Sequence, residues 1–409
     1  MSEIITGCIA MFLFKETSRN AFNLQREVGH FQDNYEKIFK KRLPHTDTVD
    51  RVMCRLSPQD LESINAAFVS RLIEQRLFRC FKILGKYYGI AIDGTGINSC
   101  EENNKEQNLP SKISKNGKVT YHSYVIDAKL VTSSGMAISI ANERVANQSD
   151  GSDTEFDKQD CEQKAFERLA EKIKKDYPRL PICILADGLY PNQTFMKICQ
   201  DNNWTYIVVL KDKSLKGLQE DIIDVENKHR HSRQFHRQQG RKRIHQKCEW
   251  ITEQLTHAGH TVYWLSCTET ITNLDKNGKV VSVEEPTRFV NLTSMKVDND
   301  NIPDIANAGR MRWKIENEGF NTQKNGGYNL SHKYSRKSFT AGKNYYQCLQ
   351  IAHTLNQLVE KSTEMVTLFK ANGKLTTKHL WEQLRSMLTY IIDVADFESN
   401  KKTQVRLAG

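Results

Sequence analysis

Three acidic residues in this sequence have the types and positions expected of ligands for divalent metal ions. Asp93 and Asp187 each directly follow a short apolar run and precede a glycine, in IAIDGTG and ILADGLY. Glu316 lies in RMRWKIENEGF, residues 310–320, four residues after Arg312. Two carboxylates held side by side repel each other unless a cation joins them, and such oxygen ligands suit Mg²⁺ or Mn²⁺. Two such ions would activate a water or hydroxyl group and stabilise the leaving oxygen of a phosphodiester.

Each of these residues also has an ordinary explanation. An aspartate before a glycine at a strand end is a common turn residue, and an arginine and a glutamate four apart often form a surface ion pair. The three acids follow one another on separate predicted elements, and this agreement favours the metal site. Trp313 and Phe320 are seven residues apart, so we expect them to form the helix face that packs on a sheet.

Hydrophobic periodicity predicts the elements that would position these acids. Strands are predicted at 87–92, 121–132, 136–145, 181–186 and 204–210, and helices at 160–177, 192–202 and 303–324. The sequence SSG at 133–135 predicts a hairpin, and DGTG at 93–96 predicts a turn after the first strand. This order is that of a ribonuclease H-like α/β fold, a mixed sheet flanked by helices. Its first and fourth strands are neighbours, so Asp93 and Asp187 would lie side by side.

The charge balance indicates a polyanionic partner. Lys and Arg number 59 against 49 Asp and Glu, which gives a net charge of +10, and nucleic acid is the commonest polyanion. Eight cations and no acid occur in residues 228–247, and we expect these cations to contact DNA phosphates. They are Lys228, Arg230, Arg233, Arg237, Arg241, Lys242, Arg243 and Lys247. The alternative is a solvated charged loop.

Histidines, tryptophans and cysteines add little chemistry. His229 and His231 alternate with arginines, which favours polar contacts over a metal pair. Trp250 and Trp264 could stack on a base, but we expect them in a hydrophobic core. The ten cysteines include no C-x-x-C pair and suggest no disulfide framework, and the sequence has no signal peptide. We therefore expect a protein of the reducing cytoplasm, associated with the nucleoid.

Four segments are predicted along the chain. Residues 1–85 are helical, begin with a buried apolar helix at 4–14, and are a candidate for binding DNA ends. Residues 86–210 and 303–345 would form the ribonuclease H-like catalytic domain. Residues 211–302 would be a β-rich insertion with strand-like runs at 248–254, 261–269 and 288–297. Residues 346–409 are predicted to be helical and are a candidate for dimerisation.

The motifs around the three acids resemble those of DDE transposases of bacterial insertion sequences. The resemblance rests on IDGTG, ILADGLY and GRMRWKIENEGFNTQKN, and on residues 158–190. It covers roughly residues 85–360 and indicates the subgroup with a β-strand insertion between the second Asp and the Glu. The helix with Trp313 beside Arg312 is its most specific part.

This resemblance implies roles for individual residues. Asp93, Asp187 and Glu316 would hold two Mg²⁺ or Mn²⁺ ions, and Arg312 would contact DNA phosphate or orient the site. The family has a Tyr three residues before this Arg and a Lys seven after the Glu. Gly309 and Gln323 stand at those positions here, and Lys324 comes one residue later, about 100° further round an α-helix. The resemblance also implies cleavage by water, attack of the freed 3′-hydroxyl on target DNA, and a homodimer assembled on double-stranded DNA.

Three functions remain open from the sequence. The first is a cut-and-paste DNA transposase, and the second is a ribonuclease H-like metal-dependent nuclease without strand transfer. The third is a transposase-derived DNA-binding protein that has lost catalysis. The three intact acids argue against the third.

Overall fold

The computed structural model describes residues 1–100, 109, 111–114, 116–145, 161–212, 214–336, 338–373, 375–391 and 405–408. The chain forms two compact units. The first contains residues 1–80, 94–176 and 314–409, and the second contains residues 81–93 and 177–313. The four segments expected from the sequence remain a prediction.

Helices of the N-terminal region build the core of the first unit. They are α1 (Ser2–Leu13), α2 (Arg19–Arg26), α3 (Phe31–Phe39), α4 (Thr46–Met53) and α5 (Pro58–Glu74), followed by a 3₁₀ turn at Arg79–Phe81. Met11 and Phe12 of α1 are buried in one core with Leu349 of α11 (Phe339–Glu360), which confirms the prediction of a buried first helix. In the part of the chain that the structure describes, no helix is long and apolar enough to span a membrane. Two further helices, α12 (Thr363–Ala371) and α13 (Thr377–Met387), follow α11.

The first unit also contains the predicted hairpin. Strand β3 (Val119–Val131) pairs antiparallel with β4 (Ala137–Val145), and β3 also pairs with β2 (Ser111–Ile113). Asn142 of β4 contacts Gln347 of α11, whereas Glu143 contacts Arg168 of α6 (Glu162–Asp176). Successive side chains of a strand point to opposite faces, so α11 and α6 cover the two faces of this hairpin.

Strand β1 (Tyr88–Cys100) is longer than predicted, and it contributes residues to both units. The predicted turn at DGTG is wrong, because the strand continues through Gly94 and Gly96. Gly94 lies against the ring of Tyr124 on β3, and a Cβ atom there would overlap that ring. These glycines therefore permit close packing between neighbouring strands rather than a change of direction.

In the second unit, three parallel strands continue the sheet. Residues 88–91 of β1 pair with β5 (Ile182–Ala186), and β5 pairs with β6 (Thr205–Val209). Helix α7 (Gln193–Asp201) connects β5 to β6, as predicted. Strand neighbours are thus β4-β3-β1 in the first unit and β1-β5-β6 in the second. This order confirms the expected α/β, ribonuclease H-like fold class, because the first strand pairs with the second and the fourth.

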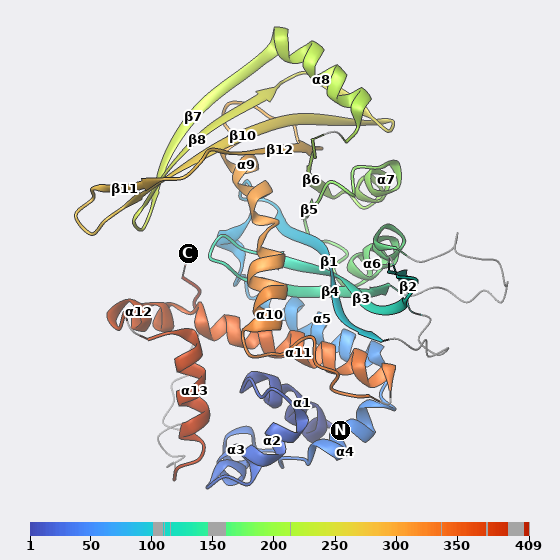
Figure 1. Ribbon diagram of the computed structural model, residues 1–409, viewed down its shortest axis with the longest axis vertical. Coiled ribbons are helices and arrows are strands. Elements are labelled where there is room, and N and C mark those ends of the chain that lie inside the picture. Colours follow the sequence, from blue (N-terminus) through green and yellow to red (C-terminus); the bar gives the residue numbers. More distant parts are fainter. Residues whose placement is uncertain are drawn as a thin grey trace, which may run out of the picture. The chain divides into compact units, whose positions relative to one another are not determined.

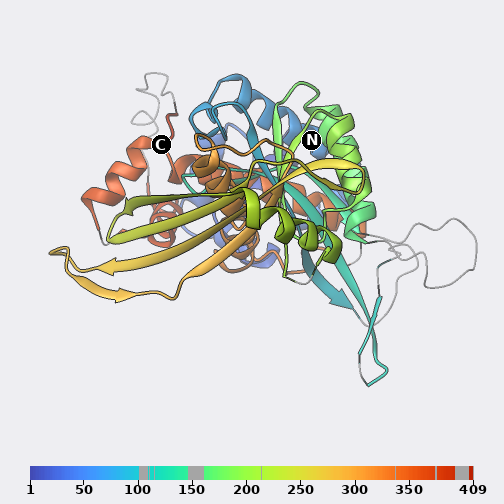
Figure 2. The ribbon, with the colours of Figure 1, turned by 90° about the horizontal axis from the view of Figure 1, so that it is seen from above.

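The insertion extends this sheet from the edge of β6. Strand β12 (Thr287–Thr293) pairs antiparallel with β6 and is followed across the sheet by β10 (His260–Leu274), β8 (Lys242–Ile251) and β7 (Arg230–Gln239). Short strands β9 (Leu255–His257) and β11 (Val280–Val283) pair with β10. Figures 1 and 2 show β7, β8 and β10 as one long twisted ribbon.

Two features of the insertion differ from the sequence prediction. Helix α8 (Lys216–His229) was not predicted, and the cationic segment, for which no strand was predicted, forms the hairpin β7–β8. Gly240 lies at the turn of this hairpin with φ near +58°, a conformation that glycine adopts without strain.

The predicted helix at 303–324 is divided into three parts. Helix α9 (Ile302–Met311) belongs to the second unit, whereas a π-helical turn (Ile315–Asn321) and the short helix α10 (Thr322–Asn325) belong to the first. Phe320 is 5% exposed, but Trp313 is 45% exposed, so the prediction that both seat the helix on the sheet is wrong for Trp313. Trp313 lies at the break after α9, where helical spacing no longer sets the direction of side chains.

Substituting Gly94 by alanine tests the packing of β1 on β3. We expect Gly94→Ala to lower the free energy of unfolding by about 1–3 kcal/mol, because the added methyl group displaces Tyr124. Thermal and urea unfolding would measure the loss. Gly96→Ala is the matched control, since its Cβ would lie 4.0 Å from the nearest Tyr124 atom. Equal stability of the two variants would contradict this account.

Candidate active site

The pairing of β1 with β5 sets the positions of the two predicted aspartates. Tyr88 pairs with Ile182 and Ala91 with Leu185, so partners differ by 94 in residue number. Asp93 and Asp187 differ by the same number and stand two residues beyond the last pair. Continuing the register therefore places them opposite each other on adjacent parallel strands, which lie about 4.8 Å apart. Partners in register point to the same face, so both carboxylates emerge on one side of the sheet.

That side of the sheet carries the end of α9. A Cβ atom on Gly89 would lie 3.5 Å from Cε of Met311, and Gly89, Ala91 and Asp93 share one face of β1 by alternation. Arg312 follows Met311 directly as the C-terminal cap of α9. Its Nη1 lies 3.5 Å from Oδ2 of Asp93, and the residue is 6% exposed. The structure thus brings two of the predicted residues, Asp93 and Arg312, into contact.

Asp187 has two hydrogen-bond donors. Its Oδ1 accepts the backbone N–H of Leu189 at 2.8 Å, and its Oδ2 accepts from Nζ of Lys211 at 2.9 Å. Lys211 was missed by the sequence analysis. Its position right after the apolar run of β6 was the available signal, because parallel strands end at one edge of a sheet. Gly188 permits the approach, since a Cβ there would lie 2.7 Å from Cγ of Lys211.

Glu316 and Lys324 belong to the first unit. Glu316 stands in the π-helical turn, where Ile315, Gly319 and Phe320 are the buried residues. Nζ of Lys324 donates to Oγ1 of Thr95 at 2.7 Å, and Thr95 is a buried residue of β1.

The π-helical turn explains why Lys324, rather than Gln323, faces β1. A π turn closes its hydrogen bond one residue later than an α turn, so it contains one extra residue. The eighth residue after Glu316 therefore takes nearly the direction of the seventh in an α-helix. Gln323 points inward instead, where its Nε2 donates to Oε1 of Gln350 at 2.7 Å and to Nδ1 of His353 at 2.9 Å. The extra residue of the π turn thus compensates for the position of Lys324 one residue later in the sequence.

A buried polar network supports the π turn. Lys129 and Asp127 of β3 are fully buried and form an ion pair of 2.8 Å, and Nζ of Lys129 also donates to Gln350 at 2.8 Å. A Cβ on Gly319 would lie 3.1 Å from the Lys129 side chain, so the turn packs directly on β3. Burial lowers the pKa of Lys129, whereas the charge of Asp127 opposes this effect. Such a network is stable only while its members remain paired.

The donor set fits a hard divalent cation. Asp93, within β1, and Asp187, just after β5, provide carboxylate oxygens from adjacent strands. Such oxygens are ligands that Mg²⁺ and Mn²⁺ prefer. In this structure their charges are compensated by the cations of Arg312 and Lys211. Within the described ranges, no group of three His, Cys, Asp or Glu side chains is arranged to hold a metal ion. The metal ligands therefore remain a prediction.

The cationic hairpin of the insertion presents its charges on both faces. Cross-strand pairing puts Arg233, Arg237 and Lys242 on one face and Arg230, Arg243 and Lys247 on the other. The first face is the one that meets α9, because Gln246 on that face donates to Asn307 at 3.2 Å. Arg241 lies at the hairpin turn, and the side chain of Lys228 lies outside the described residues.

Several of these cations have acidic partners. Glu249 pairs with Arg230 at 2.5 Å and with Lys247 at 2.6 Å. Burial raises the pKa of Glu249, but its bonds with these two cations outweigh burial and hold the pKa below its usual value. Arg237 pairs with Glu269 at 3.4 Å.

Four cations of the hairpin have weaker or no acidic partners. Lys242 lies 3.8 Å from Glu284, and Arg233 donates to the carbonyl of Asn299 at 2.7 Å. Arg241 and Arg243 are exposed and form no ion pair with any described carboxylate. These two arginines are therefore the hairpin cations that remain most available to a polyanion.

The tryptophans and histidines of the insertion have structural contacts. Trp250 and Trp264 are 3% and 2% exposed, which confirms their expected place in the core. His231 stacks on Trp250 with ring centroids 5.6 Å apart, and His229 lies 2.8 Å from Glu253.

Comparison with known proteins gives a family model that covers more than half of the chain. The model of a family described as "Transposase DDE domain" matches residues 84–343. None of the curated proteins matches the chain. Among solved structures, the chain is similar to the piggyBac transposase synaptic complex with hairpin DNA, determined by cryo-EM. The identity is 10%, the match covers 95% of this chain and 70% of that chain, and the TM-score is 0.38, too low to support an argument.

Acid destabilisation tests the network beneath the π turn. Burial, followed by the charges of Lys129 and Lys15, lowers the pKa of His353 well below its ordinary value of 6.5. Below pH 6.5 the unfolded chain therefore binds a proton at this residue that the folded protein does not. As the pH falls below 6.5, protonation of this residue in the unfolded chain should therefore lower the free energy of unfolding, with a slope approaching about 1.4 kcal/mol per pH unit.

Replacing this histidine provides the measurement. We expect His353→Gln to flatten the fall in stability between about pH 6.5 and pH 5, as measured by urea unfolding. His379→Gln, which removes an exposed histidine of α13, is the control. A slope unchanged from wild type in His353→Gln would contradict a neutral buried imidazole.

Proposed function

This chain belongs to the family of transposase DDE domains, and we propose that it is a cut-and-paste DNA transposase. In this proposal it cleaves DNA at the ends of its own element and joins the freed ends to target DNA. Asp93, Asp187 and Glu316 are the proposed ligands of two divalent metal ions. The observation that carries the proposal is the register of β1 and β5, which sets two carboxylates opposite each other.

Metal ions held by these carboxylates supply activation of a water or 3′-hydroxyl group and stabilisation of the leaving oxygen. The paired aspartates favour this role because their mutual repulsion is relieved when cations bind. In this proposal Arg312 and Lys211, which contact them here, exchange a carboxylate for a DNA phosphate when metal ions bind the aspartates. Lys324 presents a third cation from the opposite end of the Glu316 segment, and we assign it to a phosphate contact.

The insertion provides the proposed DNA-contacting cations. Arg241 and Arg243 are the primary candidates, because no described carboxylate neutralises them. Arg230 and Lys247, which both pair with Glu249, are further proposed contacts. The remaining proposed contacts are Lys228, Arg233, Arg237 and Lys242. Contacts to phosphates bind DNA without reading its sequence.

The proposal also includes the DNA partners, the oligomeric state and the cellular location of the protein. The partners are the element ends and the target, both double-stranded DNA, held by a homodimer assembled on them in the cytoplasm. Residues 1–85 are proposed to contact element ends, and residues 346–409 to contribute to dimerisation.

Substituting the proposed third ligand tests catalysis. Glu316→Gln should lower DNA cleavage with Mg²⁺ by on the order of 10³-fold or more, because a neutral amide is a poor metal ligand. Its affinity for the same DNA should remain within about twofold of wild type. The substrate is a duplex bearing the terminal sequences that flank the gene, and cleaved and joined products are resolved on a denaturing gel.

Glu318→Gln is the matched control, because Glu318 lies in the same π turn and pairs with Lys314. Cleavage by Glu316→Gln at the wild-type rate would refute the assignment. Cleavage without joining by the wild-type protein would indicate a nuclease, and binding without cleavage would indicate a DNA-binding protein that has lost catalysis.

Salt dependence tests the insertion. Arg243→Gln should weaken binding to DNA of any sequence and reduce the slope of log affinity against log salt by about 0.9. Fluorescence anisotropy over a salt series measures both. Lys197→Gln, on the exposed side of α7 in the same unit, is the control for the loss of one charge. An unchanged slope in Arg243→Gln would remove this residue from the DNA interface.

A further inference from the structure

A cavity in the first unit is separate from the residues assigned above. Its volume is about 470 Å³, and its walls come from β1, β3, β4, residues 330–336 and 338, and the first turns of α11. Three cationic side chains line it, Arg144, Lys333 and Arg336, and no acidic residue does. Lys333 and Arg336 are exposed enough to meet a ligand from solution.

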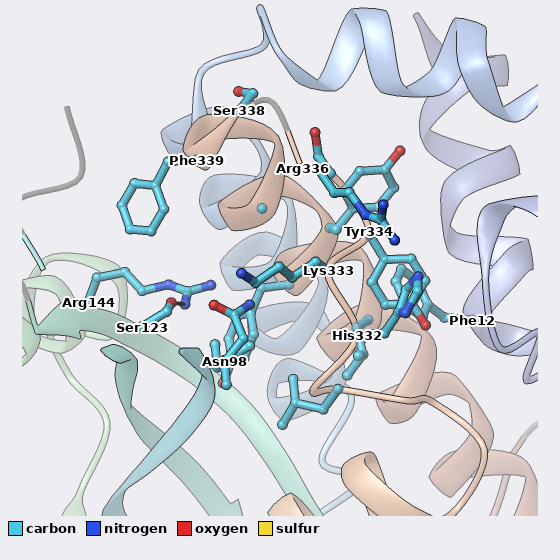
Figure 3. A pocket seen from close by; sticks show the side chains of 17 residues that line it. Phe12, Asn98, Ser123, Arg144, His332, Lys333, Tyr334, Arg336, Ser338 and Phe339 are labelled. Atoms are coloured by element: carbon cyan, nitrogen blue, oxygen red, sulfur yellow. Dashed lines mark hydrogen bonds between the residues drawn. The ribbon is translucent and has the colours of Figure 1, made fainter. Parts of the chain in front are cut away.

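The cations of this cavity have no described carboxylate within ion-pair distance, although the charges of Glu143, Glu62 and Asp127 act on Arg144 from farther away. In the described part of the chain, no carboxylate forms an ion pair with Arg144, Lys333 or Arg336. Figure 3 shows Lys333 and Arg144 pointing toward the same space, with Ser123 and Asn98 beside them. Like charges that converge repel, and an anion between them removes the repulsion. Burial lowers the pKa of the neighbouring His332, and the charge of Arg336 lowers it further.

The site is held in place by packing and hydrogen bonds. The guanidinium of Arg144 lies 5.0 Å from the centre of the Tyr346 ring, and its Nη1 donates to Oγ of Ser123 at 3.0 Å. Its remaining N–H groups are left to serve a ligand. Oγ of Ser335 is buried, lines the cavity and has no hydrogen-bond partner among the described residues.

The N-terminal end of helix α11 adds an electrostatic field that favours anions. Its first residues, Phe339 and Gly342, line the cavity, and the helix runs for 22 residues. The N-terminus of a helix attracts anions through its free N–H groups and its dipole. A Cβ on Gly342 would meet no atom within 4 Å, which leaves the cavity open on this side. Cations, a hydroxyl and a helix end thus surround one space.

The cavity lies close to Lys324 along β1. Thr95, which accepts a hydrogen bond from Lys324, and Ile97, which lines the cavity, are two residues apart on the same strand face. Two residues of a strand span about 6.6 Å, roughly the spacing of neighbouring phosphates in an extended nucleic-acid strand. A strand whose phosphate meets Lys324 could therefore place a nearby phosphate in the cavity.

We propose that this cavity binds a phosphate group of a DNA strand together with its nucleoside. The proposal rests on the transposase function proposed above and adds a second phosphate-binding position. Arg144 and Lys333 bind the phosphate oxygens, and Arg336 adds positive charge at the rim. A volume of 470 Å³ exceeds that of one phosphate and falls within the usual range of ligand pockets, so the attached nucleoside has room.

Binding of a labelled oligonucleotide tests this proposal. The probe is a single strand of about 12 nucleotides, measured by anisotropy in magnesium-free buffer so that no cleavage occurs. We expect the double variant Lys333→Gln/Arg336→Gln to bind at least tenfold more weakly than wild type. Its slope of log affinity against log salt should be smaller by roughly 0.7. Arg144→Lys, which keeps the charge but shortens the reach, should give an intermediate loss.

The matched control is Lys164→Gln/Lys175→Gln. These two lysines of α6 are exposed in the same unit and do not line the cavity, so the control has the same change of net charge. Unchanged melting temperatures will show that all variants fold. Equal affinities of the cavity variant and the control variant would overturn the proposal.

Competition identifies the source of the phosphate. Inorganic phosphate and a nucleoside triphosphate should displace the oligonucleotide only at concentrations at which any salt of the same ionic strength does so. Displacement of the oligonucleotide by either one at lower concentration, lost in the cavity variant, would overturn the DNA assignment in favour of a free anion.

The outcome is separable from that of the proposed function. If wild type cleaves element ends and the cavity variant binds and cleaves as wild type does, the cavity proposal fails and the transposase proposal stands. If the wild-type protein binds the oligonucleotide but never cleaves element ends, and the cavity variant binds the oligonucleotide at least tenfold more weakly, the cavity proposal stands and the transposase proposal fails.

Discussion

The parallel register of β1 against β5 is the constraint on which the proposed chemistry depends. Side chains alternate along a strand, so a slip of one residue would turn Asp93 to the other face of the sheet. The register is fixed by the fully buried residues Ile90, Ile184 and Leu185 and by Gly89, which lets Met311 approach. Apolar packing thus forces two carboxylates together, and cations must compensate the repulsion. Arg312 and Lys211 do so here.

A buried carboxylate connects α9 to the insertion in the same unit. Glu269 of β10 is 4% exposed and contacts Arg310 at 3.1 Å and Gln246 at 3.0 Å. Arg310 in turn lies 3.8 Å from the centre of the Phe289 ring on β12. The insertion is therefore more than an appended DNA-binding ribbon, because it holds the helix that ends at Arg312. A change in the ribbon would be transmitted to the cation beside Asp93.

Local sequence patterns predicted the elements that pack one face against a single neighbouring element. The apolar strands, the β3–β4 hairpin and helices α6 and α7 carry their periodicity in the sequence. The aspartates could be placed because each directly follows the apolar run that predicted its strand. Helix α8 and the hairpin β7–β8 were not predicted. Strand β7 is exposed along nearly its whole length and has no apolar alternation that would indicate a strand. Lys211 and the orientation of Trp313 depend on tertiary neighbours, which the sequence around them does not reveal.

The π-helical turn changes how related chains should be aligned with this one. A single extra residue inside a helix normally rotates everything after it, but here the wider turn takes up the extra residue. An ungapped alignment through this helix would set the lysine that the resemblance implies seven residues after the glutamate against Gln323, which is buried here. A gap placed within residues 315–321 would set it against Lys324. Positions after this turn should therefore be compared by the neighbours that they contact rather than by counting from Glu316.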